Sequence, residues 1–340
     1  MHEPVTVALD AMGGDRGPAV SVPAALSMLA QDRQVRLILV GKPEVLEPLL
    51  GDARRRHGDR LVLEPAAQVV GMDEHPRDAM RKKKNSSMRV AIDLVRDGRA
   101  GACVSAGNTG ALMATARFVL RTLPGIDRPA IISAVPSLGG HTHMLDLGAS
   151  VECTPEQLFQ FAVMGAIVAT DIHELERPRV GLLNIGAEDI KGNDRIREAA
   201  RLLTQSSLNY IGFVEGNDIF QGTVDVVVTD GFTGNVSLKT MEGLAHLITA
   251  HMRAELSRNW RNRLLGLLSS PVLKSLKSTL DTRRYNGASL VGLNGIVIKS
   301  HGGADELAFR NAIRTAVVEI DKGVPRQISR LLNEQPPTSN

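Results

Sequence analysis

The stretch VVVTDGFTGNV at Val226–Val236 joins a strongly apolar run to a turn that carries glycine, acid, hydroxyl and amide side chains. An apolar β-like run followed by glycines recurs in LDAMGGD at Leu9–Asp15, VSAGNTGA at Val104–Ala111 and LLNIGAEDIKGN at Leu182–Asn193. A strand that ends in glycines and passes into a helix leaves free backbone N–H groups, which form an anion site. Four such turns predict parallel strands whose carboxyl ends meet at one crevice, where open parallel sheets bind ligands.

Short β-branched or apolar runs recur along the chain and are predicted to be strands. They are Val5–Leu9, Val35–Val40, Leu61–Leu63, Ala102–Ser105, Ala130–Val135, Val180–Leu183, Tyr210–Val214 and Val224–Thr229, with a further strand-like run at Gly295–Ser300. Segments between them have apolar residues at helical spacing. These are Pro18–Ala30, Ser86–Arg96, Thr109–Leu120, Pro155–Ile172 and Asp194–Leu203. Strands that alternate with helices predict an α/β fold with a mostly parallel sheet.

The composition is that of an ordinary globular protein. Of 340 residues, 43% are apolar and 23% are charged, which suffices for a full core. A net charge of +3 and only 3% aromatic residues argue against a nucleic-acid partner, since such proteins present basic surfaces and stacking side chains. No apolar run approaches the ~20 residues of a membrane-spanning helix and no signal peptide is visible, so the sequence predicts a cytoplasmic protein.

Residues 1–333 are expected to form a single catalytic α/β domain, and the polar, proline-containing tail 334–340 is expected to be disordered. The cysteines, Cys103 and Cys153, have neither metal-ligand spacing nor a disulfide pattern. Cys103 lies inside an apolar run and is predicted to be a buried, inert thiol. Cys153 precedes Thr154-Pro155 at a predicted helix start and is either incidental or reactive. No metal site and no cofactor are predicted.

One region, from His251 to Tyr285, departs from the strand–helix alternation. It contains eight basic residues against two acids, and Pro271 favours the start of a new helix. We predict a helical hairpin inserted at about 251–285, with a leucine-rich tip and cationic flanks. The apolar residues expected at the tip are Leu264, Leu265, Leu268, Val272 and Leu276. They would pack on a partner subunit or enter a bilayer surface, and the cationic flanks favour an anionic membrane.

Two of the glycine turns offer candidate binding residues in the first third of the chain. The turn LDAMGGD supplies Asp10, Gly13, Gly14 and Asp15, and the turn VSAGNTGA supplies Ser105, Gly107, Asn108, Thr109 and Gly110. Backbone amides and hydroxyls of these residues would hold a phosphate or a pantetheine amide. Acids and glycines are also the usual residues of tight turns and helix caps, so a purely structural role stays open.

The later turns supply the residues with the clearest chemical potential. Lys191 stands between two glycine turns, where it would clamp a phosphate or an oxyanion unless it is a surface lysine. Asp230, Thr233 and Asn235 follow a buried-type strand, and the Asn235 amide can donate to an oxyanion. His301 precedes two glycines and is either a general base near neutral pH or a hydrogen-bonded structural histidine.

The basic run Arg81–Lys84 precedes a plausible helix cap at Ser86. Its default interpretation is a solvated face. The alternative is a docking patch for an acidic partner, with Arg283-Arg284 as a second candidate.

These motifs resemble those of the PlsX family of bacterial acyl-[acyl-carrier-protein]:phosphate acyltransferases. The resemblance rests on DAMGGD, RKKKNSSM, VSAGNTGAL, RPAI, LLNIG…KGN, DVVVTDGFTGNVSLKTMEG and the late HGG, in the expected order from Val5 to Asp321. Small departures are Ser150 where Asn is usual, Ala187-Glu188-Asp189 for Gly-Glu-Glu, and Arg16-Gly17 for His-Ala. They weaken the assignment of individual substrate contacts but leave Lys191 and Asn235 in place.

The resemblance implies a Rossmann-like three-layer α/β/α fold like that of phosphotransacetylases and isocitrate-type dehydrogenases. It implies transfer of a fatty acyl group from acyl carrier protein to inorganic phosphate for phospholipid synthesis. It also implies a homodimer in peripheral contact with the inner face of the cell membrane, and a downstream membrane acyltransferase as a possible partner. We assign Lys191 to the phosphate or the oxyanion, and Asn235 to the thioester oxygen. No serine or cysteine nucleophile is required, because positioning and electrostatics suffice.

Three rival functions stay open. A nicotinamide dehydrogenase would share the architecture, but the sequence lacks the dinucleotide fingerprint. A phosphotransacetylase-like enzyme would use acyl-coenzyme A instead of a carrier protein. A non-catalytic, membrane-associated scaffold would have no need of Lys191, Asn235 and the glycine turns.

Overall fold

The computed structural model describes residues 4–173, 175–273 and 281–334. An 11-stranded sheet runs through the molecule in the order β3-β2-β1-β4-β11-β10-β5-β6-β9-β7-β8. The strands are β1 (Val5–Asp10), β2 (Val35–Gly41), β3 (Leu61–Pro65), β4 (Ala102–Ser105), β5 (Ala130–Ser137), β6 (Gly140–Leu145), β7 (Val180–Leu183), β8 (Tyr210–Val214), β9 (Val226–Val228), β10 (Ala288–Val291) and β11 (Ile296–Lys299).

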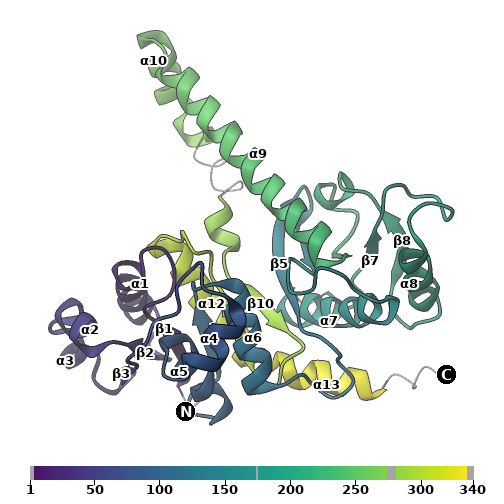
Figure 1. Ribbon diagram of the computed structural model, residues 1–340. Coiled ribbons are helices and arrows are strands. Elements are labelled where there is room, and N and C mark those ends of the chain that lie inside the picture. The colour runs from purple at the N-terminus through teal and green to yellow at the C-terminus, as the bar shows by residue number, and fades with distance from the viewer. Residues whose placement is uncertain (1–3, 174, 274–280, 335–340) are drawn as a thin grey trace.

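The sheet has two parallel blocks that form two lobes. Strands β3, β2, β1, β4 and β11 pair in parallel in the first lobe, and β6, β9, β7 and β8 pair in parallel in the second. The antiparallel pairs β11–β10, β10–β5 and β5–β6 join the blocks in the middle of the sheet. Figure 1 shows the lobes side by side, with β5 and β10 between them. The prediction of a mostly parallel α/β sheet is therefore confirmed.

Helices connect the strands and cover the sheet. They are α1 (Pro18–Gln31), α2 (Pro43–Leu50), α3 (Ala53–His57), α4 (Pro76–Lys82), α5 (Ser87–Arg96), α6 (Thr109–Leu120), α7 (Pro155–His173), α8 (Asp194–Thr204), α9 (Gly231–Ser257), α10 (Trp260–Leu268), α12 (Glu306–Lys322) and α13 (Val324–Glu334), with short 3₁₀ turns at Gly58–Arg60, Asp218–Phe220 and Thr282–Tyr285.

The layers follow from the alternation of side chains along the buried strands. In β1, Val7 and Leu9 face a core that contains Val20 of α1 and Phe309 of α12, whereas Ala8 faces a core that contains Ile92 of α5. In the second lobe, a separate core joins the sheet to α7, α8 and α13. The first lobe is thus a three-layer α/β/α unit, as the family resemblance implies.

Most predicted elements are present, and β6 and β10 are additional to them. Segment β6 reads GHTHML, and its glycine and two histidines hide the β pattern. Segment β10 has only four residues, ASLV. Both segments form strands because they pair with β5. Local sequence patterns do not predict this pairing. The predicted helix start at Thr154-Pro155 is confirmed, since α7 begins at Pro155 and the Thr154 hydroxyl accepts the Gln157 N–H at 3.3 Å.

The hairpin projects from the body as a long arm (Figure 1). Its first helix, α9, has 27 residues and begins at Gly231, directly after β9, well before the predicted start at His251. Asp230 caps α9, and no proline interrupts it before Ser257. Helix α10 then packs back on α9, as Gly266 against Leu256 illustrates. Among the described residues, no helix is both long and apolar enough to cross a membrane. The predicted tip residue Leu276 and tail residues 335–340 lie outside the described residues.

Candidate active site

Three glycine-containing loops of the first lobe meet because their strands are neighbours. Asp10, Ser105 and Lys299 end β1, β4 and β11, and they share one register position across the three strands. The Ser105 hydroxyl donates to Asp10 Oδ2 at 2.6 Å and accepts the Gly107 N–H at 3.0 Å. Burial raises the pKa of Asp10, and the hydrogen bond from Ser105 opposes this shift. Both side chains are almost fully buried, so their hydrogen bonds position the loop backbone.

The glycines of these loops stand where a side chain would not fit. A Cβ on Gly13 would lie 2.5 Å from Asp10 Oδ2 and 2.9 Å from the Gly107 nitrogen. Gly14 has φ +92°, and its Cβ would lie 3.0 Å from the Gly302 carbonyl oxygen. The Asp15 N–H donates to that same oxygen at 2.9 Å. The turn at Leu9–Asp15 is therefore in direct contact with the glycines that follow His301, and the meeting of all four predicted turns at one crevice stays a prediction.

The loop VSAGNTGA opens α6 and also joins it to the segment before α4. The Asn108 side chain accepts the Ala111 N–H at 2.9 Å and donates to the carbonyls of Met72 (2.7 Å) and Glu74 (3.0 Å). Its amide is thus fully engaged, which leaves the backbone N–H groups of Thr109 and Gly110 at the helix start. Because these N–H groups have no intrahelical acceptor, they are suited to bind an anion.

Lys299 is a member of the site that the sequence analysis missed. Its ammonium group donates to the carbonyls of Ser300 (2.5 Å) and Ala106 (3.2 Å). Burial lowers the pKa of Lys299 to about 8, with a further lowering by Lys239, while Asp10 and Asp15 oppose the shift. The sequence pattern that could have identified Lys299 is its position at the end of the apolar run IVIK. A lysine is rarely buried unless it has a polar partner, so a lysine at the end of a buried strand is a candidate site residue.

His301 links this lobe to the arm. Its backbone N–H donates to Asn286 Oδ1 at 2.9 Å, and its Nδ1 accepts the Gly303 N–H at 3.1 Å. Its Nε2 lies 3.5 Å from Nζ of Lys239 on α9. Lys239 also donates to Glu242 at 2.7 Å. The contact between Lys239 and His301 bridges the two lobes. Lys239 was also missed, although its position four residues after Asn235 places both on one face of a helix.

In the second lobe, the start of α9 is fixed by two carboxylates. Asp230 caps the helix by accepting the Thr233 N–H at 2.7 Å. Asp146, which the sequence analysis did not single out, is fully buried. It accepts backbone N–H groups from Ile131, Gly148, Ala149 and Ser150, at distances of 2.7–3.1 Å. Asn235 is exposed and lies against Gly148, where an added Cβ would be 3.5 Å from Asn235 Cγ.

Lys191 lies in the loop between β7 and α8 and is exposed. Its side chain forms no hydrogen bond or ion pair with the described residues, and its backbone N–H donates to the Glu188 carbonyl at 2.9 Å. Since β7 and β9 are neighbours, this loop and Asn235 lie at the same edge of the second lobe. No hydrogen bond or ion pair among the described residues joins Lys191 to Asn235 or to the loops of the first lobe.

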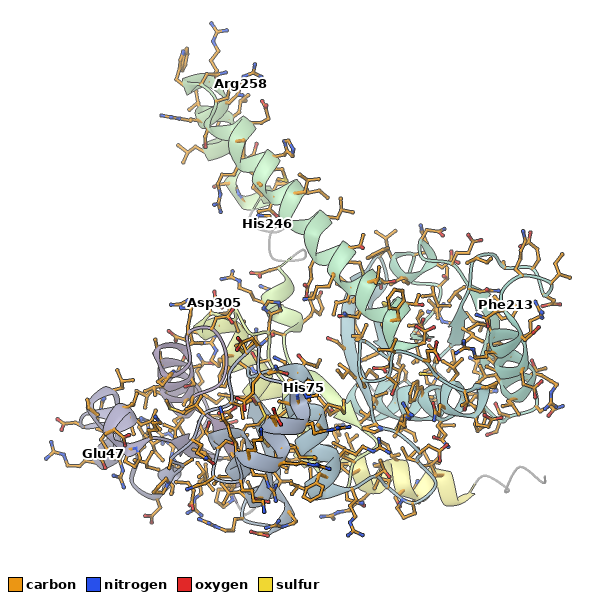
Figure 2. All side chains as sticks on the ribbon, viewed as in Figure 1. Glu47, His75, Phe213, His246, Arg258 and Asp305 are labelled. Atoms are coloured by element: carbon orange, nitrogen blue, oxygen red, sulfur yellow. The ribbon has the colours of Figure 1, made fainter. Side chains whose placement is uncertain are left out.

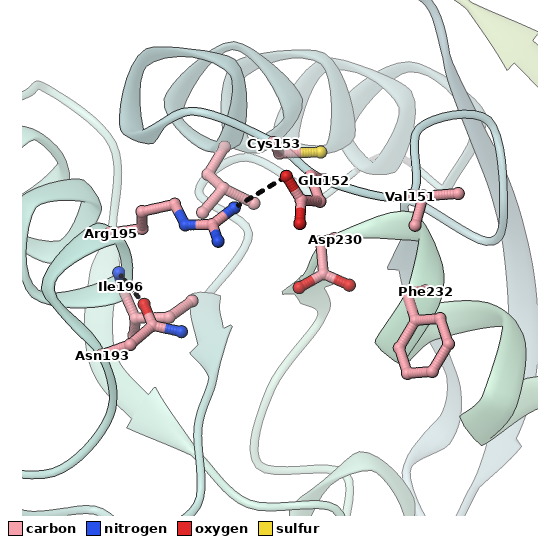
Figure 3. Close-up of a pocket in the computed structure, with 9 residues that line it drawn as sticks. Val151, Glu152, Cys153, Asn193, Arg195, Ile196, Asp230 and Phe232 are labelled. Carbon is pink, nitrogen blue, oxygen red and sulfur yellow. Dashed lines mark hydrogen bonds and ion pairs between the residues drawn. The ribbon is translucent and has the colours of Figure 1, made fainter.

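A cavity of about 290 Å³ lies beside Asp230, where α7, α8 and α9 begin (Figure 3). Its walls combine apolar side chains with polar groups, among them Val151, Phe232, Asn193 and Arg195. Arg195 points across it to Glu152, at 3.8 Å. Such a mixed lining is typical of small-molecule pockets.

Both cysteines are buried, which confirms the prediction for Cys103. Burial raises the pKa of Cys103 well above its usual range and that of Cys153 to about 12. Cys153 therefore lines the cavity as a thiol and is a poor nucleophile. No group of three or more metal-ligating side chains lies together anywhere in the described part of the chain.

The basic run near α4 divides into exposed and half-buried members. Arg81, Lys82 and Lys84 are exposed. Lys83 is half-buried, pairs with Glu74 at 2.5 Å and donates to the Val69 carbonyl at 2.6 Å, so it supports the loop. Arg283, from the second candidate patch, forms ion pairs with Asp281 (2.6 Å) and Asp305 (2.8 Å).

Comparisons with known proteins agree with this architecture. A family model described as "Fatty acid synthesis protein" matches residues 5–327. The chain is 60% identical over 332 residues to a phosphate acyltransferase from Alkalilimnicola ehrlichii, covering 98% of this chain and 97% of that protein. It is 59% identical over 329 residues to a phosphate acyltransferase from Methylococcus capsulatus, covering 97% of each.

Solved structures show the same fold in more distant proteins. A phosphotransacetylase from Streptococcus pyogenes superposes with a TM-score of 0.64 at 16% identity, covering 94% of this chain and 95% of that one. This likeness concerns the fold alone. The family match over nearly the whole chain and the relatives' high identity lead to one conclusion: the chain belongs to the fatty acid synthesis protein family and is an acyltransferase.

Proposed function

We propose that this protein transfers a fatty acyl group from acyl-[acyl carrier protein] to inorganic phosphate, for use in phospholipid synthesis. A phosphate oxygen attacks the thioester carbonyl carbon, the carbon–sulfur bond breaks, and the products are acyl phosphate and the free carrier thiol. The observation that carries this proposal is the identity of up to 60% to phosphate acyltransferases over almost the entire chain. The crevice supports it, because it combines glycine loops, a helix start and exposed polar donors at one sheet edge.

The chemistry requires a bound phosphate, an aligned thioester and a stabilised oxyanion. We assign the phosphate to the crevice formed by the loops at Gly13–Gly14 and Gly107–Gly110. We assign the thioester oxygen to the Asn235 amide, which is exposed at the start of α9. Lys191 would approach the phosphate or the oxyanion from the neighbouring loop.

The carrier protein is expected to dock near α4. The Asn108 hydrogen bonds tie the segment before α4 to the start of α6, so the exposed Arg81, Lys82 and Lys84 lie close to the crevice. A basic surface there suits an acidic carrier. The cavity beside Asp230 offers a mixed polar and apolar lining for part of the pantetheine arm or the acyl chain.

We further propose that the protein is a cytoplasmic homodimer that contacts the membrane through its arm. Large apolar side chains at the tip are strongly exposed: Leu264 (50%), Leu265 (59%), Leu268 (71%) and Val272 (70%). Basic residues Arg258, Arg261 and Arg263 lie among them. A surface of this kind suits the interface of an anionic bilayer, where acyl phosphate would pass to a membrane acyltransferase.

The direct test is to incubate the purified protein with palmitoyl-[acyl carrier protein] and labelled inorganic phosphate. Labelled acyl phosphate and free carrier thiol should form together, and neither should form when phosphate is omitted. Transfer from palmitoyl-coenzyme A but not from the carrier would favour the phosphotransacetylase-like alternative. No transfer from either donor would leave the scaffold alternative.

A further inference from the structure

The approach of Lys239 to His301 is unusual because both facing atoms are hydrogen-bond donors. His301 Nδ1 accepts the Gly303 N–H at 3.1 Å, so this nitrogen carries no proton. From this hydrogen bond we assign the ring proton to Nε2, the atom that lies 3.5 Å from Lys239 Nζ. A lysine ammonium has three N–H donors and no acceptor. The two groups therefore cannot hydrogen-bond to each other, and a shared acceptor would satisfy both.

The surroundings of the pair leave Lys239 with donors for a further acceptor. One Lys239 N–H is taken by Glu242 at 2.7 Å, which leaves two for another partner. Lys299 lies below, with its ammonium group near enough to Lys239 to affect its own pKa. Asp15 Oδ2 would lie 3.4 Å from a Cβ on Gly303, and the Asp15 backbone N–H donates to the Gly302 carbonyl. The charges of Asp10 and Asp15 also act on the Lys299 ammonium group.

We propose that His301 Nε2–H and Lys239 Nζ together bind one oxygen of the phosphate acceptor, which is thereby held between the two lobes. This inference rests on the proposed function. It differs from a general-base role for His301, because the nitrogen that faces the crevice already carries the proton. It also differs from binding by Lys191, which has no recorded contact with this cluster.

The position of Lys239 on α9 gives the proposal a geometric consequence. Asn235 and Lys239 are one helical turn apart on the same face, so their Cα atoms are separated by about 6 Å along the axis. A phosphate at Lys239 and a thioester oxygen at Asn235 would then be neighbours, as required for attack. The same helix would position nucleophile and electrophile.

The test measures binding of inorganic phosphate by calorimetry in the absence of any acyl donor. His301→Asn keeps an acceptor near the Nδ1 position for the Gly303 N–H but removes the outer donor. His301→Gln places an amide N–H near the Nε2 position. We expect His301→Asn and Lys239→Met each to weaken phosphate binding by about 10- to 100-fold, the usual range for a hydrogen bond to a charged group. His301→Gln should retain most of the affinity, and His251→Asn on the exposed arm is the matched control.

A second measurement does not depend on the variants folding. In ¹⁵N-histidine NMR spectra of the wild-type protein, His301 should show the Nε2–H tautomer, and phosphate should shift its Nε2 signal. An Nδ1–H tautomer, or wild-type phosphate affinity in both His301→Asn and Lys239→Met, would overturn the proposal. Acyl transfer is assayed separately: if the wild-type protein binds phosphate through this pair but forms no acyl phosphate from any donor, the proposed function fails and the phosphate site stands.

Discussion

The two ends of α9 differ in how closely the rest of the protein packs around them. At its base, Gly231 and Gly234 are the buried residues of the helix, and a Cβ on Gly234 would lie 1.9 Å from the Asp146 carbonyl oxygen. Along the arm, an added Cβ on Gly243 would meet nothing within 4 Å. Figure 2 shows the side chains of His246 and Arg258 extending from the arm, clear of both lobes.

The difference assigns separate tasks to the two ends. The base is fixed by close backbone contacts and carries Asn235 and Lys239, the residues that we propose to contact the substrates. The arm exposes Leu244, Leu247 and Ile248, which are 55%, 51% and 40% accessible. Exposed apolar surface of this extent marks an interaction site. Chemistry is thus expected at the base, and contact with a membrane or a second subunit along the arm.

The largest expected effect is on turnover, from changes at the base. Asn235→Ala should reduce the rate of acyl phosphate formation by about 10²- to 10³-fold, because it removes one donor to the oxyanion. Arg253→Ala on the exposed arm is the control and should leave the rate in solution unchanged. Steady-state assays with carrier protein and phosphate both saturating would measure the difference. Near-normal turnover of Asn235→Ala would contradict the division of tasks.

Lys191→Ala tests whether the neighbouring loop also takes part. The sequence analysis predicts a loss comparable to that of Asn235→Ala. Since Lys191 is exposed and has no described side-chain partner, its replacement should leave the melting temperature unchanged. An unchanged rate would remove Lys191 from the site and leave Lys239 and Lys299 as the cations of the crevice.

The next effect is on stability and compares two glycines of the same helix. Gly234→Ala should destabilise the protein by roughly 1–3 kcal/mol or more, because its methyl group would overlap the Asp146 carbonyl. Gly243→Ala should stabilise the arm by about 0.5–1 kcal/mol, the usual gain in a helix interior without steric conflict. Thermal and urea unfolding would measure both. Equal effects would mean that the base is not constrained as the structure indicates.

The fold was largely predictable because its determinants are local. Apolar runs that end in glycine predict β1, β4, β7 and β9, and the helical spacing of apolar residues predicts the helices that connect the strands. The antiparallel centre of the sheet was not predictable, since β6 and β10 are defined by pairing with β5 and not by their own residues.

The candidate site was predictable in part for the same reason. Glycine loops are recognisable from their composition, so Gly13, Gly14 and Gly107 could be named as candidate binding residues from the sequence. The pairing of Lys239 with His301 joins residues 62 positions apart, and the burial of Lys299 depends on three strands in register. No local pattern specifies either. Lys191 was prominent in the sequence; its exposed side chain forms no hydrogen bond or ion pair with the described residues, and its role stays a prediction.

At the tip of the arm, the expected effect is on membrane binding. Leu265→Asp with Leu268→Asp should reduce binding to anionic liposomes at least tenfold, because both side chains are exposed and would carry charge into the interface. Sedimentation with vesicles containing phosphatidylglycerol would measure it, with soluble acyl transfer as the control. If the double variant instead becomes monomeric by light scattering, the leucines belong to a subunit interface and the membrane proposal fails.

The smallest expected effect concerns the carrier protein and separates two basic surfaces. Lys82→Glu with Lys84→Glu reverses exposed charges beside the crevice and leaves Lys83 to hold its loop through Glu74 and the Val69 carbonyl. The KM for acyl carrier protein should rise about 3- to 10-fold, and the effect should shrink at high salt, since exposed charges are screened. The KM for phosphate should stay constant, because the altered residues do not line the loops that hold it. Arg261→Glu with Arg263→Glu makes the same change at the tip and should weaken liposome binding without altering the KM for the carrier. If the tip variant raises that KM instead, the carrier docks along the arm, and the division between a catalytic base and a membrane-facing arm would have to be abandoned.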